Sequence, residues 1–77
     1  MGDIGHRAAQ AIEERSKANG RTLTEEFRAL GMYAKTKGDW KERGIDPSAY
    51  WLQQLAFAGF DVMWILTGKS DMEVPHD

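Results

Sequence analysis

Helix stop signals at short intervals are the feature that most limits how this chain can fold. Five short segments each end at a glycine, namely Gly20, Gly31, Gly44, Gly59 and Gly68. Glycine is favoured just after a helix because it readily adopts the left-handed conformation that closes the last turn. None of the five segments shows the alternation of apolar and polar residues that is typical of a half-buried strand. The pattern therefore predicts an all-α domain built from five short helices.

Capping residues define the first two expected helices. One covers residues 4–18, with Asp3 as its N-cap. The next covers residues 23–30, where Thr22 and Glu25 stand three residues apart and form a capping box. We expect both helices to pack their apolar residues against a shared core.

The next two expected helices differ in how clearly the sequence marks them. The third covers residues 33–42 and contains Gly38, which costs a helix about 1 kcal/mol relative to alanine. The fourth has Asp46 as its N-cap and Pro47 at its first helical position, and it closes at Gly59. The third helix is therefore the less regular of the two.

The fifth expected helix covers residues 62–67 and has Asp61 as its N-cap. Polar residues 70–77 follow it and are expected to form a flexible tail, which leaves residues 1–69 as the folded domain. Five large apolar side chains of the second half are expected in the core: Trp40, Leu52, Leu55, Ile65 and Leu66.

Length and composition restrict the class of protein. A chain of 77 residues buries only roughly 60% of its unfolded surface, so its core is thin. There is no cysteine, which excludes disulfides and thiolate metal sites. No basic and apolar leader follows Met1, and the longest charge-free stretch, residues 47–60, is too short to span a bilayer. We therefore expect a cytoplasmic protein.

Groups that could carry catalysis are few and scattered. The two histidines, His6 and His76, lie near opposite ends of the sequence, and no carboxylate stands at obvious ligand spacing from His6. Ser48 is better explained by helix capping than as a nucleophile. Adjacent residues such as Glu25 and Glu26 diverge by about 100° on a helix, so they do not form a catalytic pair. We expect no enzymatic activity, no metal and no cofactor.

Charge is unevenly distributed along the chain, whose net charge is −2. Residues 35–43 carry four basic and two acidic side chains, whereas residues 44–77 carry one basic and five acidic side chains. A short basic segment in a neutral-to-acidic protein can face a polyanion, or it can be a solvated helix face. Charge alone leaves both interpretations open.

The second and third expected helices have the form of a helix-turn-helix. They are short, and a turn containing Gly31 separates them. In such a unit the first helix supports the second, which enters the major groove of DNA with its N-terminal side chains leading. Those side chains here include Tyr33, Lys35, Thr36 and Lys37, which can contact guanine edges, phosphates and thymine methyl groups. Many small helical bundles contain a similar pair, so the spacing by itself is weakly specific.

A set of short motifs in the second half makes the interpretation more specific. Trp40-Lys41-Glu42-Arg43-Gly44 is followed by Pro47-Ser48-Ala49, then by Ala58-Gly59-Phe60-Asp61-Val62, and finally by Ile65-Leu66-Thr67-Gly68. In these blocks and their spacing the chain resembles the Cro/phage-repressor type of helix-turn-helix domain, especially short prophage-encoded regulators. The resemblance covers most of residues 4–69.

This resemblance implies a lambda-repressor-like helical domain that binds double-stranded operator DNA as a symmetric homodimer and represses transcription. The positions that it implies for reading bases are Tyr33, Ala34, Lys35, Thr36 and Asp39, and those that it implies for binding phosphates are Lys41 and Arg43. No cofactor is implied.

Aromatic residues are more numerous in the last two helices than a small core can bury. The surplus comprises Tyr50, Trp51, Phe57, Phe60, Met63 and Trp64. Aromatic side chains and methionine are enriched in interfaces, so these residues are candidates for a homodimer or partner interface. The alternative is that the rings fill gaps between short helices. A second hypothesis for function follows, in which the fold is a protein-binding module without DNA binding, such as a phage-encoded inhibitor or antirepressor.

Overall fold

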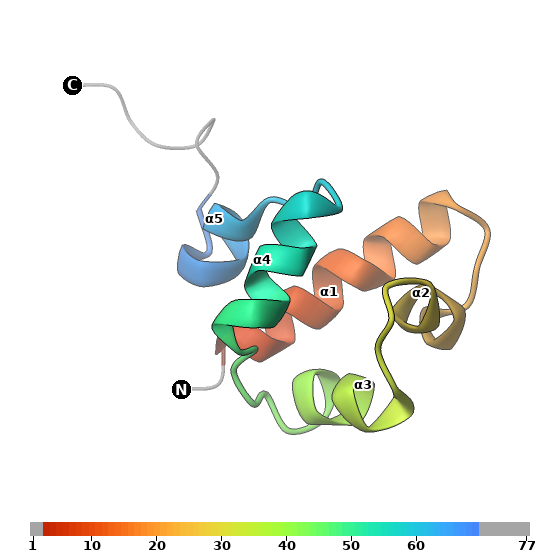
Figure 1. Ribbon diagram of the computed structural model, residues 1–77, viewed down its shortest axis with the longest axis horizontal. Helices are drawn as coiled ribbons and strands as arrows, with labels where there is room; N and C mark the ends of the chain where they lie inside the picture. The colour runs from red at the N-terminus through yellow and green to blue at the C-terminus, as the bar shows by residue number, and fades with distance from the viewer. Residues whose placement is uncertain (1–2, 70–77) are drawn as a thin grey trace.

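Five helices make up the part of the chain that the structure describes, residues 3–69 (Figure 1). They are α1 (Asp3–Ala18), α2 (Leu23–Ala29), α3 (Ala34–Lys41), α4 (Ala49–Phe57) and α5 (Val62–Thr67). Within this range there is no strand, so the expected all-α class is confirmed. The longest helix, α1, packs against α2, α3 and α5, while α2 also contacts α3 and α4 contacts α5. The tail expected at residues 70–77 lies outside the described residues, as does His76.

The core contains side chains from every helix. Its buried apolar residues are Ala8, Ala9, Ile12, Phe27, Met32, Trp40, Leu55 and Ile65. Three of the five large side chains expected there, Trp40, Leu55 and Ile65, are confirmed, and Leu52 is half-buried against them. The prediction for Leu66 is wrong, because this side chain is 39% exposed. A helix turns by about 100° per residue, so a short helix that points Ile65 inward turns its neighbour toward solvent.

Local capping explains where α2 and α5 begin. Around α2 both halves of the expected capping box are present, with Thr22 Oγ1 accepting from the Glu25 N–H at 3.1 Å. Asp61 caps α5 as expected by accepting from the Trp64 N–H at 3.0 Å. Glycines with positive φ follow the helices at the positions where the sequence predicted the stops.

The start of α4 differs from the expectation. Ser48, rather than Asp46, is the N-cap, and its hydroxyl accepts from the Trp51 N–H at 3.3 Å. Pro47 is buried and lies before the helix instead of at its first position. The loop before α4 is attached to α3, because the Ile45 N–H donates to the Asp39 carbonyl at 2.8 Å. Residues 44–48 therefore lie outside any helix, and α4 begins only after Ser48.

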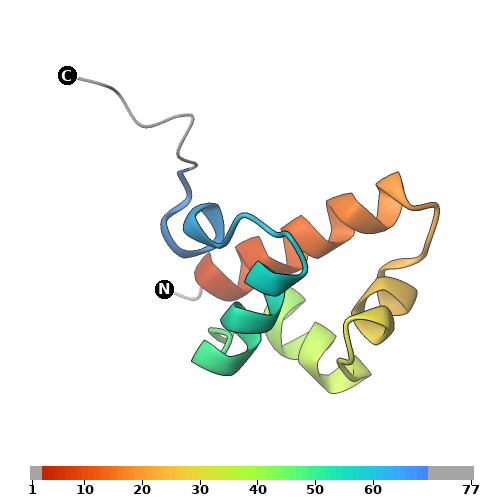
Figure 2. The same cartoon turned by 45° about the horizontal axis from the view of Figure 1, so that its top comes forward.

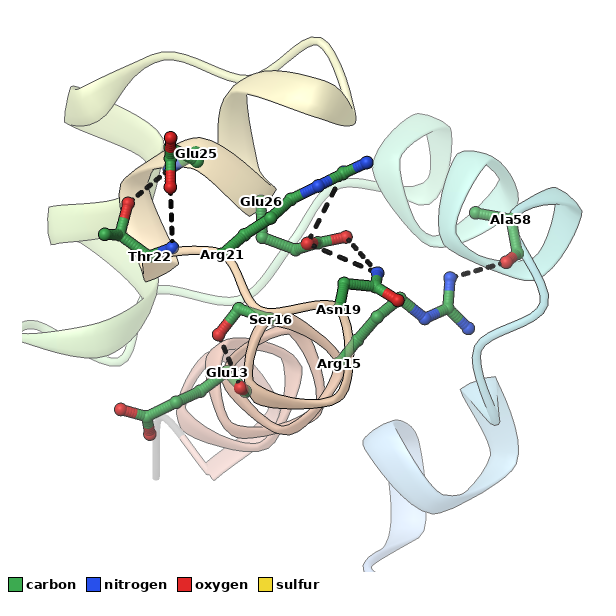
Figure 3. Close-up of polar contacts among 9 residues, drawn as sticks. All are labelled: Glu13, Arg15, Ser16, Asn19, Arg21, Thr22, Glu25, Glu26 and Ala58. Atoms are coloured by element: carbon green, nitrogen blue, oxygen red, sulfur yellow. Dashed lines mark hydrogen bonds and ion pairs between the residues drawn. The ribbon is translucent and has the colours of Figure 1, made fainter.

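Two arginines of α1 tie the C-terminal helices to it. Arg7 donates from Nε to the Ile65 carbonyl at 2.8 Å and from Nη2 to the Leu66 carbonyl at 3.0 Å. Arg15 donates to the Ala58 carbonyl at 2.6 Å, a contact visible in Figure 3, and its guanidinium lies 3.6 Å from the ring centre of Phe60. Carbonyls near a helix C-terminus lack partners within the helix, and these two side chains supply them.

Gly5 marks the closest approach between α1 and the loop before α4. A Cβ atom at this position would collide with the Ile45 carbonyl oxygen and would lie 2.8 Å from the Gly44 carbonyl carbon. Both obstacles are backbone atoms, so no side-chain rotation could relieve the contact. Gly38, in the middle of α3, is different, because a Cβ atom there would meet nothing within 4 Å.

The capping box of α2 makes part of the stability depend on pH. The Thr22 N–H donates to Glu25 Oε1 at 2.8 Å. This backbone hydrogen bond, followed by the one to the Thr22 hydroxyl, holds the pKa of Glu25 below its ordinary value of 4.5. Because the pKa is lower in the folded state, the stabilisation is fully present above the ordinary value and is lost as the pH falls through the folded pKa.

We therefore expect Glu25→Gln to lose stability at neutral pH but little in acid. Urea unfolding at about pH 7 and about pH 3 should show a smaller difference between the two pH values for this variant than for the wild type. Glu14→Gln, which changes an exposed carboxylate of α1, is the matched control and should keep more of that difference. An equal change in both variants would contradict the role assigned to Glu25.

Candidate nucleic-acid interface

The helix pair α2 and α3 forms one end of the molecule (Figure 2). Their axes point in clearly different directions in both views, and a short turn through Gly31 joins them. The Phe27 and Trp40 rings pack between them, with centroids 5.9 Å apart and planes tilted by 58°. This contact holds α3 in place although Gly38 lowers its intrinsic helix propensity. The segment that the sequence assigned to a helix is therefore helical from Ala34 to Lys41.

The first turn of α3 is open to solvent. Tyr33 is 79% exposed, and Ala34 and Lys35 are also exposed, whereas Thr36 is half-buried. Tyr33 is the N-cap, but no side-chain hydrogen bond caps this helix. The backbone N–H groups of a first turn favour negative charge. The start of α3 thus combines free donors, an exposed ammonium group and an exposed aromatic ring.

The other cations of the expected DNA-binding segment have partners within the molecule. Lys37 Nζ donates to Thr24 Oγ1 at 3.0 Å. Lys41 forms an ion pair with Glu13 at 3.5 Å, and Arg43 forms one with Asp39 at 3.4 Å. Ion pairs at the surface contribute only about 0–1 kcal/mol, so a phosphate could replace either carboxylate at small cost. Asp39, expected at a base-reading position, is here a partner of Arg43.

One of the two carboxylates at the start of α2 faces inward. Glu26 is 3% exposed, and its carboxylate lies 3.4 Å from Asn19 Nδ2 and 3.6 Å from Arg21 Nη1 (Figure 3). Glu25 is exposed and is held by the capping box. The sequence carried a signal for this difference, since adjacent helical residues diverge by about 100° and only one of the two can face outward. Only Glu25 therefore remains on the outer surface of α2.

Comparison with known proteins adds no family to this description. No family model, curated protein or solved structure matches the chain. Within residues 3–69 the structure establishes a small, compact all-helical domain of five helices. The resemblance to phage repressors therefore stays a prediction from the sequence motifs between Trp40 and Gly68.

The aromatic surplus of the last two helices divides into two groups. Trp51, Phe60 and Trp64 are half-buried and pack against the core, so they fill gaps between the short helices. The remaining three side chains are exposed, by 59% for Tyr50, 75% for Phe57 and 49% for Met63. Of the six candidates for an interface, these three remain free to contact a partner.

The groups considered for catalysis have other environments. His6 is exposed, and its Nδ1 lies 3.1 Å from the Lys41 carbonyl oxygen. Ser48 caps α4. Within residues 3–69 no three His, Asp or Glu side chains are close enough together to hold a metal ion. In the same range no helix has both the length and the apolar character needed to cross a membrane.

Proposed function

We propose that this protein is a sequence-specific DNA-binding transcriptional regulator that contacts operator DNA through residues 33–43. The observation that carries the proposal is the first turn of α3, where Tyr33, Ala34 and Lys35 are exposed beside α2 and no side chain caps the helix. A helix that presents donors at its N-terminal end is the kind of element that reads base edges in the major groove. The motifs shared with phage repressors support the same function.

Each residue of the segment has a role in this proposal. Lys35 and Thr36 contact base edges and give sequence preference, while Tyr33 and Ala34 lie against the edge of the groove. Lys41 and Arg43 exchange their carboxylate partners for backbone phosphates and make binding dependent on salt. Two copies occupying half-sites about one helical turn apart would then block access of the polymerase.

The test is binding to DNA selected from a random library, followed by fluorescence titration at two salt concentrations. We expect Lys35→Ala to weaken binding to the selected site by about 1–3 kcal/mol and to relax the preference at one position. Lys69→Ala, which removes an exposed lysine beyond α5, is the matched control and should leave both properties unchanged. If the wild type binds neither selected nor mixed DNA at low salt, the proposed function is wrong.

A second candidate function is binding of a protein partner through α4, and one observation favours it. This helix has no charged residue, and Tyr50 and Phe57, seven residues apart on one face, are both strongly exposed. Exposed apolar patches of this kind mark interaction sites. Either a second copy of the chain or another protein could cover the patch.

Sedimentation of the wild type and of the double variant Tyr50→Ser/Phe57→Ser tests this candidate. We expect self-association in the wild type and its loss in the variant, with unchanged helicity by circular dichroism because both side chains are exposed. Tyr33→Ser, which removes an equally exposed ring from α3, should not affect self-association. A monomeric wild type that also captures no protein partner would contradict an interface on α4.

A further inference from the structure

A hollow between α2 and α3 brings together two cations without a carboxylate in its lining. Buried Phe27 and Met32 line it on the core side. Thr24 and Arg28 border it from α2, and Tyr33 and Lys37 border it from the α3 side. The two residues of each pair are four positions apart, so they lie on the same side of their helix. The hollow is thus apolar at its base and cationic at its rim.

The cationic side chains at this rim have hydrogen-bond donors that are not engaged within the described part of the domain. Lys37 is half-buried, and one of its N–H groups donates to Thr24 Oγ1 at 3.0 Å. An ammonium group has three donors, so two remain for another acceptor. Arg28 is exposed, and within residues 3–69 neither Arg28 nor Lys37 has a carboxylate oxygen within 4.0 Å. Two carboxylates precede Arg28 closely in sequence: Glu26 is buried beside Asn19 and Arg21, and Glu25 has an oxygen engaged by the Thr22 N–H.

This arrangement contrasts with that of other cations in the described part of the chain. Arg21, Lys41 and Arg43 each face a carboxylate, and Arg7 and Arg15 each bind helix carbonyls. These five positive charges are therefore balanced or used in packing. At the α2–α3 hollow, two cations converge on a concave, partly apolar surface, where ionic contacts are stronger than in bulk water.

We propose that the α2–α3 hollow binds a phosphate group, held by the Arg28 guanidinium and the Lys37 ammonium. The planar fork of arginine matches two phosphate oxygens, and lysine adds a point charge. Tyr33 also lines the hollow, and a tyrosine hydroxyl can donate a hydrogen bond to a third oxygen. The uncapped first turn of α3 adds positive potential from the same side.

The phosphate that we assign to the hollow is a phosphodiester of the DNA backbone. The choice of DNA as its source rests on the proposed function. It adds a contact from α2, through Arg28, that the sequence motifs do not assign. A free phosphate group is chemically equivalent, so the experiment needs one arm for each source.

The first arm measures the salt dependence of DNA binding for Arg28→Gln, Lys37→Met and the wild type. Each variant should lower the slope of log affinity against log salt concentration by about 0.9, which corresponds to one phosphate contact. Arg28→Lys keeps the charge and should retain the slope. Lys69→Met, which changes an exposed lysine two residues after the end of α5, is the control for nonspecific charge loss. Methionine keeps the length of Lys37 and suits the apolar base of the hollow, so this variant should fold.

The second arm follows backbone amide shifts by NMR during titration with inorganic phosphate. Shifts at residues 24–37 that are absent in Arg28→Gln support the site even if the wild type does not bind DNA, a result that refutes the proposed function alone. If the protein binds DNA and neither variant changes the slope, the inference is overturned. If it binds no DNA and phosphate moves no amide in the hollow, both proposals are overturned.

Discussion

Alanine at Gly5 is expected to destabilise the domain strongly, although alanine favours a helix by about 1 kcal/mol over glycine. The new Cβ atom would overlap the Ile45 carbonyl oxygen, so the loop at residues 44–45 would have to move away from α1. That movement would also strain the hydrogen bond from the Ile45 N–H to the Asp39 carbonyl. Overpacking of this kind costs about 1–3 kcal/mol, and loss of an intramolecular hydrogen bond adds about 0.5–1.5 kcal/mol.

The net loss should be about 1–3 kcal/mol, because the steric and hydrogen-bond costs exceed the gain in helix propensity. In a domain of this size such a loss lowers the melting temperature by roughly 5–20 °C. Thermal unfolding followed by circular dichroism measures it. Gly38→Ala is the matched control with the opposite sign, since nothing obstructs its Cβ atom, and it should gain about 0.5–1 kcal/mol. A Gly5→Ala variant as stable as the wild type would show that α1 and this loop do not meet.

Most of the helix positions could be predicted because their determinants are local. A capping box joins residues three apart, and Asp61 caps the N–H of Trp64, which is also three residues away. Both partners of each interaction can therefore be recognised from residue types that are close together in the sequence. The start of α4 could not be predicted in this way. Asp46 and Ser48 are both good N-caps, and the choice between them depends on the contacts that Gly5 and Asp39 make with the preceding loop.

Long-range polar contacts account for what the sequence did not reveal. The spacing of residues along α1 does not indicate that Arg7 and Arg15 each reach a carbonyl more than 40 residues away in the chain. The divergence of Glu25 and Glu26 on a helix likewise does not indicate that Glu26 is the one buried beside Asn19. Such roles depend on which helices become neighbours, and composition and spacing within one helix do not specify that.

In the candidate interface, too, the position of the helix could be predicted from the sequence, but the long-range contacts of its side chains could not. The sequence placed residues 33–43 on one short helix and its flanks, and α3 occupies that position. It could not show that Lys41 lies against Glu13 of α1, or that Lys37 crosses to Thr24 of α2. These contacts distinguish Lys35, which is exposed and has no ion pair in the described part of the chain, from its neighbours. For this reason the most informative substitution in the segment is at Lys35.

Trp40 is the side chain whose removal should most affect both the fold and the interface. It is 3% exposed and packs against Phe27, and it is the only fully buried residue of α3. Truncating a buried tryptophan to alanine costs about 3–5 kcal/mol, which is a large part of the roughly 4–12 kcal/mol expected for the whole domain. We therefore expect Trp40→Ala to unfold at least about 15 °C below the wild type and to lose DNA binding with it.

Two further variants separate loss of the fold from loss of the interface. Trp40→Phe keeps a ring against Phe27, so it should lose less stability and retain DNA binding below its melting temperature. Tyr33→Ala removes a ring that is 79% exposed, so its stability should change by no more than about 0.5 kcal/mol while its DNA affinity falls. Circular dichroism and fluorescence titration of the three variants give both quantities. If Trp40→Ala has the same melting temperature as the wild type, this residue does not anchor α3, and the interface proposed for residues 33–43 loses its structural support.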